Sequence, residues 1–297
     1  MNAIILAAGL GTRMQPITNF IPKPLLPIVY RPMIEINIQH LMHSGVNGIG
    51  VNLFHKAERI KKFLNKFSDS LYTVVEDKLL GTGGALLNFT KFIEDDFIVH
   101  NCDVLSNINL IGAIEFHRHN RSVATLLLTK NPGTNFIKIN KDLRVTAVSK
   151  KDKGNQYTFT GIAILSKKIF SYFPNKAFFS IIDTYQRLID EDESIMGLPT
   201  KESWYDIGSH HSYWKLHRDI FHEKTKFNEV NVHSSIHIHS TSIVKSKNLT
   251  GFVSVGPDCF ISENVSLNNT IVFENSRIEE GTYTNCLLSN KFCITVQ

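Results

Sequence analysis

Short apolar runs alternate with segments of helical periodicity through the first three quarters of the chain. The apolar runs are typical of strands buried in a sheet, and they lie at residues 3–8, 49–53, 71–75, 97–104, 123–129 and 158–165. Apolar residues recur at helical spacing at residues 32–42, 57–67, 110–117, 181–189 and 213–221. This alternation predicts an α/β domain with a doubly wound, mostly parallel sheet over residues 1–225, with an added hairpin at 136–148.

From about residue 228 the pattern changes to a period of six residues. Val255, Ile261, Leu267 and Phe273 recur every six residues, as do Cys259, Val265, Ile271 and Arg277, and an earlier row of Val232, Ile238 and Val244 is out of register. This period predicts a β-helix of two or three coils over residues 226–297. We expect it to pack or to join subunits, because open coil ends can pair with another chain. Its histidines, His233, His237 and His239, are interpreted as solvated residues rather than as a metal site.

A glycine loop with one arginine follows the first strand directly. In Gly9-Leu10-Gly11-Thr12-Arg13 the glycines let backbone N–H groups approach an oxyanion, and Arg13 offers a forked donor suited to phosphate. Ten residues later, prolines flank Lys23 and present it from a stiff segment. Because open α/β sheets bind ligands at the carboxyl ends of their strands, the loop predicts a nucleotide site. The alternative is a plain turn with two solvated cations.

The stretches 6–13 and 22–28, LAAGLGTR and PKPLLPI, closely resemble the signature of the sugar-1-phosphate nucleotidylyltransferases. The resemblance extends to about residue 221 and implies a Rossmann-like domain, while the repeats resemble the left-handed β-helix appended to many of these enzymes. It implies that Arg13 and Lys23 are catalytic and that they bind the nucleotide together with Leu6, Ala8, Gly9, Gly11 and Thr12. The P-loop motif is absent, and the third glycine of a dinucleotide fingerprint is missing.

The glycine-rich stretch after the third strand resembles the base-binding loop of this family. The resemblance implies that Gly81, Thr82 and Gly83 contact the nucleobase; the alternative is an ordinary strand-to-helix turn. Glu76 is a candidate base reader, because a carboxylate can accept from the adjacent N1–H and N2–H of guanine, whereas uracil offers only N3–H. This favours GTP, although relatives that resemble this loop include both guanylyl- and uridylyltransferases.

Two aspartates are candidate ligands of Mg²⁺. Asp103 ends a buried strand and resembles the family's Asn-Gly-Asp motif, with Cys102 in place of the glycine, and Asp206 lies in a Trp-x-Asp-x-Gly match at 204–208. Mg²⁺ is commonly held by one or two carboxylates together with phosphate and water. The alternative is that each aspartate caps the helix that follows it.

The sugar-phosphate side of the site is less clearly marked. The resemblance implies that Asn101 and Gly161 contact the sugar phosphate. Many relatives have a Glu-Lys-Pro triplet after the hairpin, and this chain has Ser149-Lys150-Lys151-Asp152-Lys153 instead. Lys150 or Lys151 takes that role, or the role is absent.

Composition excludes several other classes of protein. The 297 residues carry a net charge of +5, which suits anionic substrates, and no Lys/Arg run resembles a nucleic-acid tail. No apolar run approaches the roughly 20 residues that span a bilayer, and the amino terminus does not resemble a signal peptide, so we expect a cytoplasmic protein. The four cysteines form no C-x-x-C pair and are expected to be reduced and buried.

The sequence therefore predicts transfer of NMP from an NTP to a sugar 1-phosphate, with release of pyrophosphate. GTP and a mannose-1-phosphate-like sugar are favoured, and we expect a homo-oligomer. The alternatives are a uridylyltransferase for N-acetylmuramate 1-phosphate or another hexose 1-phosphate, a cytidylyltransferase for a non-sugar phosphate, and a silent regulatory subunit. Cys102 and the missing Glu-Lys-Pro favour the silent subunit, and the four residues Arg13, Lys23, Asp103 and Asp206 oppose it.

Overall fold

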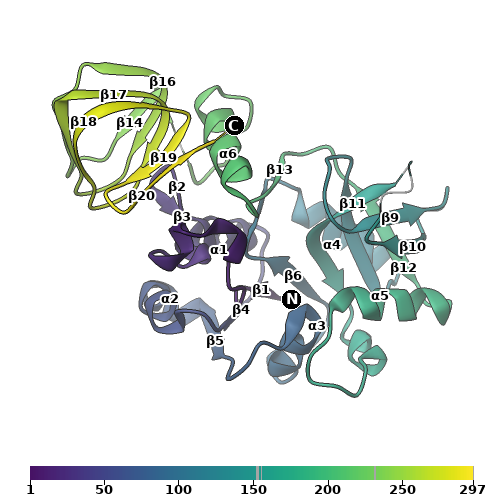
Figure 1. The fold of residues 1–297 in the computed structure, drawn as a ribbon. Coiled ribbons are helices and arrows are strands. Elements are labelled where there is room, and N and C mark those ends of the chain that lie inside the picture. The colour runs from purple at the N-terminus through teal and green to yellow at the C-terminus, as the bar shows by residue number, and fades with distance from the viewer. Residues whose placement is uncertain (152–153, 155, 231, 297) are drawn as a thin grey trace. The chain divides into compact units, whose positions relative to one another are not determined.

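The computed structural model describes residues 1–151, 154, 156–230 and 232–296 (Figure 1). The chain forms two compact units. The first unit comprises Met1–Leu10 and Asn37–Asp206, and the second comprises Gly11–Ile36 and Ile207–Gln297. The boundary that the repeats predicted, at residue 225, therefore falls inside the second unit.

Among the described residues, nine strands form the sheet of the first unit, in the order β10-β9-β11-β6-β1-β4-β5, with β8 paired to β11 and β12. They are β1 Asn2–Leu6, β4 Ile49–Leu53, β5 Leu71–Val75, β6 Phe97–Asn101, β8 Ala124–Thr129, β9 Phe136–Ile139, β10 Val145–Ser149, β11 Tyr157–Leu165 and β12 Ile195–Pro199. Only β10 and β11 run against the other seven, because β11 is antiparallel to β6, β8 and β9, and β10 is antiparallel to β9. The predicted doubly wound, mostly parallel sheet is confirmed.

Of the predicted helices only 57–67 is shorter in the structure, and the others keep or exceed their predicted length. The α-helices are α1 Met33–His43, α2 Ala57–Leu64, α3 Gly81–Gly84, α4 Leu110–His119, α5 Ile181–Asp190 and α6 His210–Phe221. The 3-10 turns are η1 Thr12–Met14, η2 Ile17–Asn19, η3 Lys23–Leu25, η4 Asn65–Ser70, η5 Ala85–Phe89 and η6 Lys167–Tyr172. The predicted helix 57–67 ends at Leu64 because Phe67 has non-helical dihedral angles. The first strand ends at Leu6, two residues before the predicted Ala8.

The order of the strands fixes where a ligand can bind. From β1 the chain passes to β4 on one side, and it later returns to β6 on the other side of β1. The crevice between the carboxyl ends of two such strands is where open α/β sheets bind ligands. Residues 7–10 follow β1, and Cys102 and Asp103 follow β6.

The second unit contains the predicted β-helix. Its strands are β14 Ile236–Ile238, β15 Ile243–Val244, β16 Asn248–Val255, β17 Phe260–Val272, β18 Arg277–Thr284, β19 Cys286–Ser289 and β20 Phe292–Thr295. Asn248 of β16 pairs in parallel with Ser266 of β17, so one coil holds three of the six-residue repeats. The row from Val255 to Phe273 is buried, as predicted. The handedness of the β-helix stays a prediction.

Several predicted features of the repeats are wrong. Ile238 is 38% exposed, and Ile236 packs on the core instead. Arg277, the last residue of the second row, is exposed, and its guanidinium lies over the ring of Phe260 and pairs with Glu279. His237 is not simply solvated, since it is half-buried and stacks on Tyr30.

The end of the chain covers one strand edge of the β-helix. β20 pairs antiparallel with β19, while β19 pairs in parallel with β17 on its other side. That edge is therefore closed to a partner strand, which restricts where the expected subunit contact can lie. Cys102, Cys259 and Cys286 are buried, but Cys293 on β20 is exposed, because alternate residues of this last strand face solvent.

Helix α6 packs on the β-helix, which explains why it lies in the second unit. The indole N–H of Trp214 donates to the carbonyl of Asn269 over 2.8 Å, and the rings of Phe221 and Phe252 stack with centroids 5.4 Å apart. These contacts hold residues 207–221 to the repeats although no repeat pattern marks them in the sequence.

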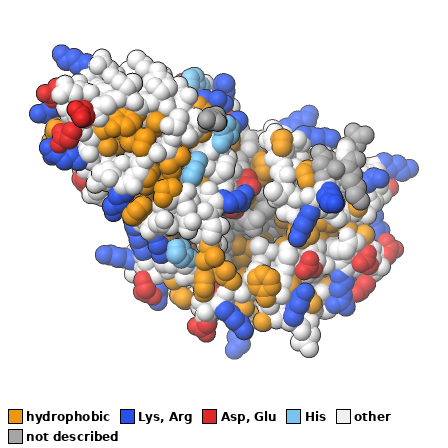
Figure 2. Space-filling model, viewed as in Figure 1, with side chains coloured by type: hydrophobic (Ala, Val, Ile, Leu, Met, Phe, Trp, Pro, Cys, Tyr) orange, Lys and Arg blue, Asp and Glu red, His pale blue; other side chains and the backbone are white. Residues whose placement is uncertain are grey.

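On the face shown in Figure 2, Lys and Arg side chains are scattered among acidic ones. In the described part of the chain, none of the helices has the length and apolar character needed to cross a bilayer.

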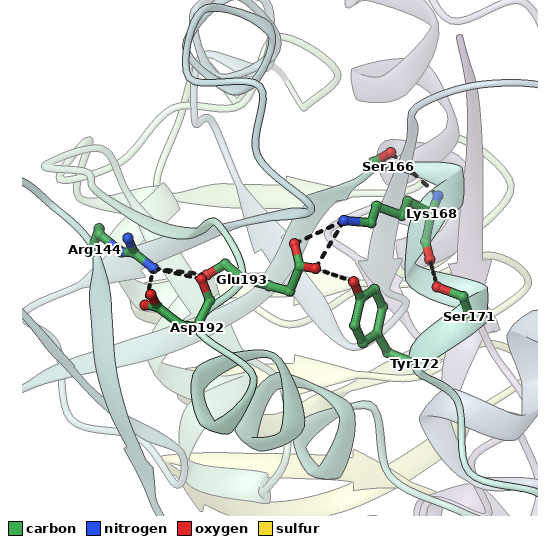
Figure 3. A network of polar contacts seen from close by, with 7 residues as sticks. All are labelled: Arg144, Ser166, Lys168, Ser171, Tyr172, Asp192 and Glu193. Carbon is green, nitrogen blue, oxygen red and sulfur yellow. Dashed lines mark hydrogen bonds and ion pairs between the residues drawn. The ribbon is translucent and has the colours of Figure 1, made fainter.

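A polar network joins three segments of the first unit (Figure 3). Lys168 donates to both carboxylate oxygens of Glu193 over 2.9 and 3.0 Å, and the hydroxyl of Tyr172 donates to one of them. Arg144 donates to the carbonyls of Asp192 and Glu193 and to the carboxylate of Asp192. The network fixes the turn between α5 and β12 against the start of β10 and against η6.

Glu193→Gln is expected to lower the Tm at neutral pH. The Tyr172 and Lys168 donors hold the pKa of the Glu193 carboxyl below its ordinary value of 4.5. A carboxyl whose pKa is depressed by folding stabilises the protein above its unfolded-state pKa, and this stabilisation is lost as the pH falls through the folded-state pKa. The difference in Tm between wild type and Glu193→Gln should therefore be constant above pH 4.5 and shrink below it. Tm is measured from pH 3 to 8, with exposed Glu94→Gln as the control, and a difference that does not change with pH would contradict this account.

Candidate functional site

A buried asparagine holds the carboxyl end of β1, at the switch point where the chain goes to β4 on one side of β1 and to β6 on the other. Asn52 on β4 accepts a hydrogen bond from the N–H of Ala7 over 2.7 Å. Gly9, two residues later, is exposed, and a Cβ added to it would meet no atom within 4 Å. Packing within the protein therefore does not require a glycine here, and the open space is compatible with the predicted close approach of a ligand.

The loop that follows belongs to the second unit and folds back on itself. Gly11 has φ +68°, and a Cβ there would lie 2.9 Å from Cγ2 of Thr18 and 3.3 Å from Cβ of Lys23. The hydroxyl of Thr18 donates to the carbonyl of Gly11 over 2.9 Å. Gly11, Thr18 and Lys23 are thus packed together, and both the positive φ and the close contacts require glycine at position 11.

The two predicted cations of this loop stand on short 3-10 turns. Thr12 and Arg13 lie on η1 and are exposed, and the guanidinium of Arg13 lies against Gly208 of the same unit. Lys23 opens η3, is half-buried, and is followed by Pro24 at a position where a helical turn tolerates proline.

The two predicted metal ligands lie at the same end of a two-stranded ribbon in the first unit. β7 (Val104–Ser106) pairs antiparallel with β13 (Trp204–Asp206), and Asp206 is the partner of Val104. Asp103 immediately precedes Val104, so strand pairing brings two residues that are about 100 positions apart in the sequence to the same end of the ribbon.

The alternative that these aspartates are helix caps is wrong for both. Asn109 caps α4 by accepting from the N–H of Gly112, and Ser209 caps α6 through a reciprocal pair of bonds with Ser212. Neither carboxylate is the cap of the helix that follows it, so their placement at the switch point needs another explanation.

The residues fit a hard divalent cation. Carboxylate oxygens are the ligands that Mg²⁺ prefers, and two of them suffice when phosphate and water supply the rest. Among the described residues no group of three or more His, Cys, Asp or Glu is placed to hold a metal, so a nucleotide would have to complete the shell. Cys102 does not distort the turn, because φ at this position is not positive, and its carbonyl accepts from Asn37 over 2.8 Å.

Glu76 has a structural role that the sequence did not predict. Its side chain is buried, one carboxylate oxygen accepts from the amide of Asn52 over 2.7 Å, and the other accepts from the N–H of Leu80 over 3.3 Å. Because Asn52 also holds Ala7, this carboxylate links the ends of β1, β4 and β5. Both oxygens already have partners, so the geometry gives no support to Glu76 as a base reader.

The glycines of the predicted base loop are surrounded by the protein's own chain. A Cβ on Gly81 would lie 2.5 Å from the carbonyl oxygen of Phe179, and one on Gly83 would lie 2.3 Å from the Phe179 ring. The hydroxyl of Thr82 accepts from the N–H of Ile181 over 3.0 Å. These small residues let the segment before α5 pack closely. This packing accounts for the small residues without contact with a nucleobase.

Asn101 and Gly161, the predicted sugar-phosphate residues, are neighbours. Gly161 has φ +82°, and a Cβ there would lie 2.7 Å from Nδ2 of Asn101. The indole N–H of Trp204 donates to the carbonyl of Thr160 over 2.8 Å, so the strand that carries Asp206 is tied to the residue before Gly161. This contact joins the predicted metal ligand and the predicted sugar site.

His100, the residue before Asn101, is a neutral part of the core. Burial lowers the pKa of its imidazole to about 3, helped by the nearby His40. Its Nδ1–H donates to the carbonyl of Asn101 over 2.9 Å, which fixes the tautomer.

Lys150 and Lys151 are exposed just after β10. Ser149 of β10 pairs with Phe136 of β9, and Phe136 pairs on its other side with Thr158 of β11. Thr158 lies three residues before Gly161. Asp152 and Lys153, the rest of the segment in place of Glu-Lys-Pro, lie outside the described residues.

Sequence reasoning missed three residues that each support a predicted site residue or its neighbour within their own unit: Thr18, Asn37 and Asn52. All three are buried. Asn37 and Asn52 are polar residues inside otherwise apolar segments, and because buried polar groups must be hydrogen-bonded, that pattern could have marked them. Thr18 carries no such signal.

The chain matches the family model described as "Nucleotidyl transferase" over residues 2–223. It is 26% identical to a UTP–glucose-1-phosphate uridylyltransferase of Synechocystis, over 99% of this chain and 88% of that protein. It is 28% identical to a probable mannose-1-phosphate guanylyltransferase of rice, over 94% and 83%. The crystal structure of HddC from Yersinia pseudotuberculosis complexed with GMP-PN superposes with a TM-score of 0.62 at 30% identity, over 74% of this chain and 99% of that one.

Thr18→Val is expected to lower the free energy of unfolding by about 1 kcal/mol, because it keeps the methyl contact with Gly11 and removes the hydroxyl that donates to the Gly11 carbonyl. Urea unfolding measures this change. Thr90→Val is the matched control, since the hydroxyl of Thr90 also donates to a carbonyl, that of Leu87, but at an exposed position. Equal losses of stability in the two variants would show that the Thr18 bond has no special role.

Proposed function

Since this chain belongs to the nucleotidyl transferase family, we propose that it transfers GMP from GTP to a mannose-1-phosphate-like sugar 1-phosphate. The class of reaction, nucleotidyl transfer to a sugar 1-phosphate, follows from the family and its relatives. The observation that carries the site is the pairing of β7 with β13, which brings Asp103 and Asp206 to the same end of one ribbon.

The reaction needs little covalent chemistry from the protein. A phosphate oxygen of the sugar 1-phosphate attacks the α-phosphorus in line, the bond from that phosphorus to the bridging oxygen breaks, and pyrophosphate leaves. Gly9, Gly11 and Arg13 would hold the departing β- and γ-phosphates, and Lys23 would stabilise charge at the α-phosphate. No general base is assigned, because the phosphate monoester is already a nucleophile.

We propose that the metal ion is Mg²⁺ and that Asp103 and Asp206 hold it. When bound, Mg²⁺ would neutralise phosphate charge and fix the phosphates in position. The adjacent carboxylates at the ribbon end and the exclusion of both helix-cap roles support this assignment.

The relatives, rather than Glu76, support guanine. HddC is complexed with GMP-PN, and several similar proteins are mannose-1-phosphate guanylyltransferases. In the proposal, the backbone near Gly81 contacts the base, while Asn101, Gly161 and the exposed Lys150 and Lys151 face the sugar phosphate.

Uridylyl transfer is the second candidate, because the relative that covers 99% of this chain is a uridylyltransferase. A silent regulatory subunit would require the four predicted active-site residues to serve another purpose. Transfer of CMP to a non-sugar phosphate would use these residues in the same roles, so they do not separate it from transfer of GMP or UMP. We also propose that subunits associate through the β-helix, at surfaces other than the edge closed by β20.

Pyrophosphate release identifies the substrates. The full-length protein is assayed in Mg²⁺ with GTP, UTP, CTP and dTTP, each against mannose, heptose, glucose and N-acetylmuramate 1-phosphates. We expect GTP with mannose 1-phosphate to be the best pair. Turnover with UTP instead would replace the guanine proposal with the uridylyl candidate, and silence of folded protein across all pairs would refute transfer to these sugars.

Asp103→Ala and Asp206→Ala are each expected to lower kcat at least about 100-fold, as loss of a charge-stabilising group can. Asp142→Ala, in the exposed turn between β9 and β10, is the matched control and should keep wild-type turnover. If either active-site variant keeps near-normal turnover, its aspartate does not hold the metal.

A further inference from the structure

Gly208 lies under the guanidinium of Arg13. A Cβ added to Gly208 would be 2.8 Å from each terminal nitrogen of Arg13 and 3.0 Å from its Cζ, and these are the three nearest atoms. Because all three distances are similar, the added Cβ would lie against the guanidinium group as a whole rather than beside one of its nitrogens. Both residues belong to the second unit, and Gly208 is buried.

The backbone does not explain this glycine. Its φ lies outside the left-handed region, unlike that of Gly11 or Gly161, so alanine could adopt the same conformation. Ser209, the next residue, supplies the cap of α6 through its side chain, and that role does not depend on position 208. Among the atoms nearest to the missing side chain, only those of Arg13 require its absence.

Arg13 itself needs a support. Its side chain is long and exposed and stands on a single 3-10 turn, so it has many rotamers of similar energy. A guanidinium packed on a flat backbone surface keeps its donors in one orientation before a ligand arrives, and such preorganisation is what electrostatic stabilisation of a leaving group requires.

We propose that Gly208 is a positioning residue that sets the Arg13 fork for the departing pyrophosphate. The inference rests on the proposed function, in which Arg13 holds these phosphates. It gives the last residue of the Trp-x-Asp-x-Gly match a role of its own, two residues after Asp206 in the chain.

A double-mutant cycle on pyrophosphate release tests the proposal. Gly208→Ala in the wild type is expected to lower kcat/KM on the order of 100-fold, as a misplacement of about 1 Å can. In an Arg13→Ala background the same substitution should change kcat/KM within about twofold, because the group it displaces is gone. Equal losses in both backgrounds would overturn the proposal. Gly112→Ala is the control, since a Cβ there meets only the flexible Asn109 side chain, and it should keep wild-type activity.

Two structural measurements keep the test independent of turnover. If Gly208→Ala lowers the Tm through its clash with Arg13, the double variant Arg13→Ala/Gly208→Ala should recover it; no recovery would contradict the contact. A crystal structure of Gly208→Ala should show the guanidinium displaced, and an unmoved Arg13 would refute the positioning role. If the wild type releases no pyrophosphate with any substrate pair, the proposed function fails, while the crystal structure still decides whether Gly208 fixes Arg13.

Discussion

The antiparallel pairing of β7 with β13 is the constraint on which the candidate site depends. It joins a segment that follows β6 to one that lies about 100 residues later, and it places Asp103 and Asp206 at one end of the ribbon. The indole of Trp204 then ties the ribbon to the carbonyl of Thr160, beside Gly161 and Asn101. Without this pairing the two carboxylates would have no reason to lie near each other, and a single hard cation could not use both.

The glycines of this protein serve different physical ends. Gly9 faces open space, so the protein's own packing does not require its missing side chain. Gly11 and Gly161 combine positive φ with close neighbours, and the base-loop glycines make room for Phe179. Gly208 makes room for a cation. In a sequence motif all of these positions are simply glycine. The structure distinguishes glycines that leave open space from glycines that leave room for other residues of the protein.

The features of the fold that depend on apolar periodicity and on local motifs were predicted correctly from the sequence. The order of strands and helices, the mostly parallel sheet and the six-residue repeat follow from apolar spacing alone. The helix ends were missed where backbone dihedral angles break a continuing apolar pattern, as at Phe67. The structural role of Glu76 was not predicted, because its two internal donors come from Asn52 and from a backbone N–H, and no spacing rule reveals either contact. The place of α6 in the second unit also depends on long-range contacts that no spacing rule reveals, such as the hydrogen bond from Trp214 to Asn269 and the stacking of Phe221 on Phe252.

Titration of the protein with Mn²⁺ in the presence of a non-hydrolysable GTP analogue tests the central claim most directly, because it detects the metal site without turnover. If Asp103 and Asp206 hold one ion together, the wild type should show a single tight site, and either aspartate-to-alanine variant should lose it. A site of unchanged affinity in both variants would show that the metal lies elsewhere, and the ribbon of β7 and β13 would then need another function.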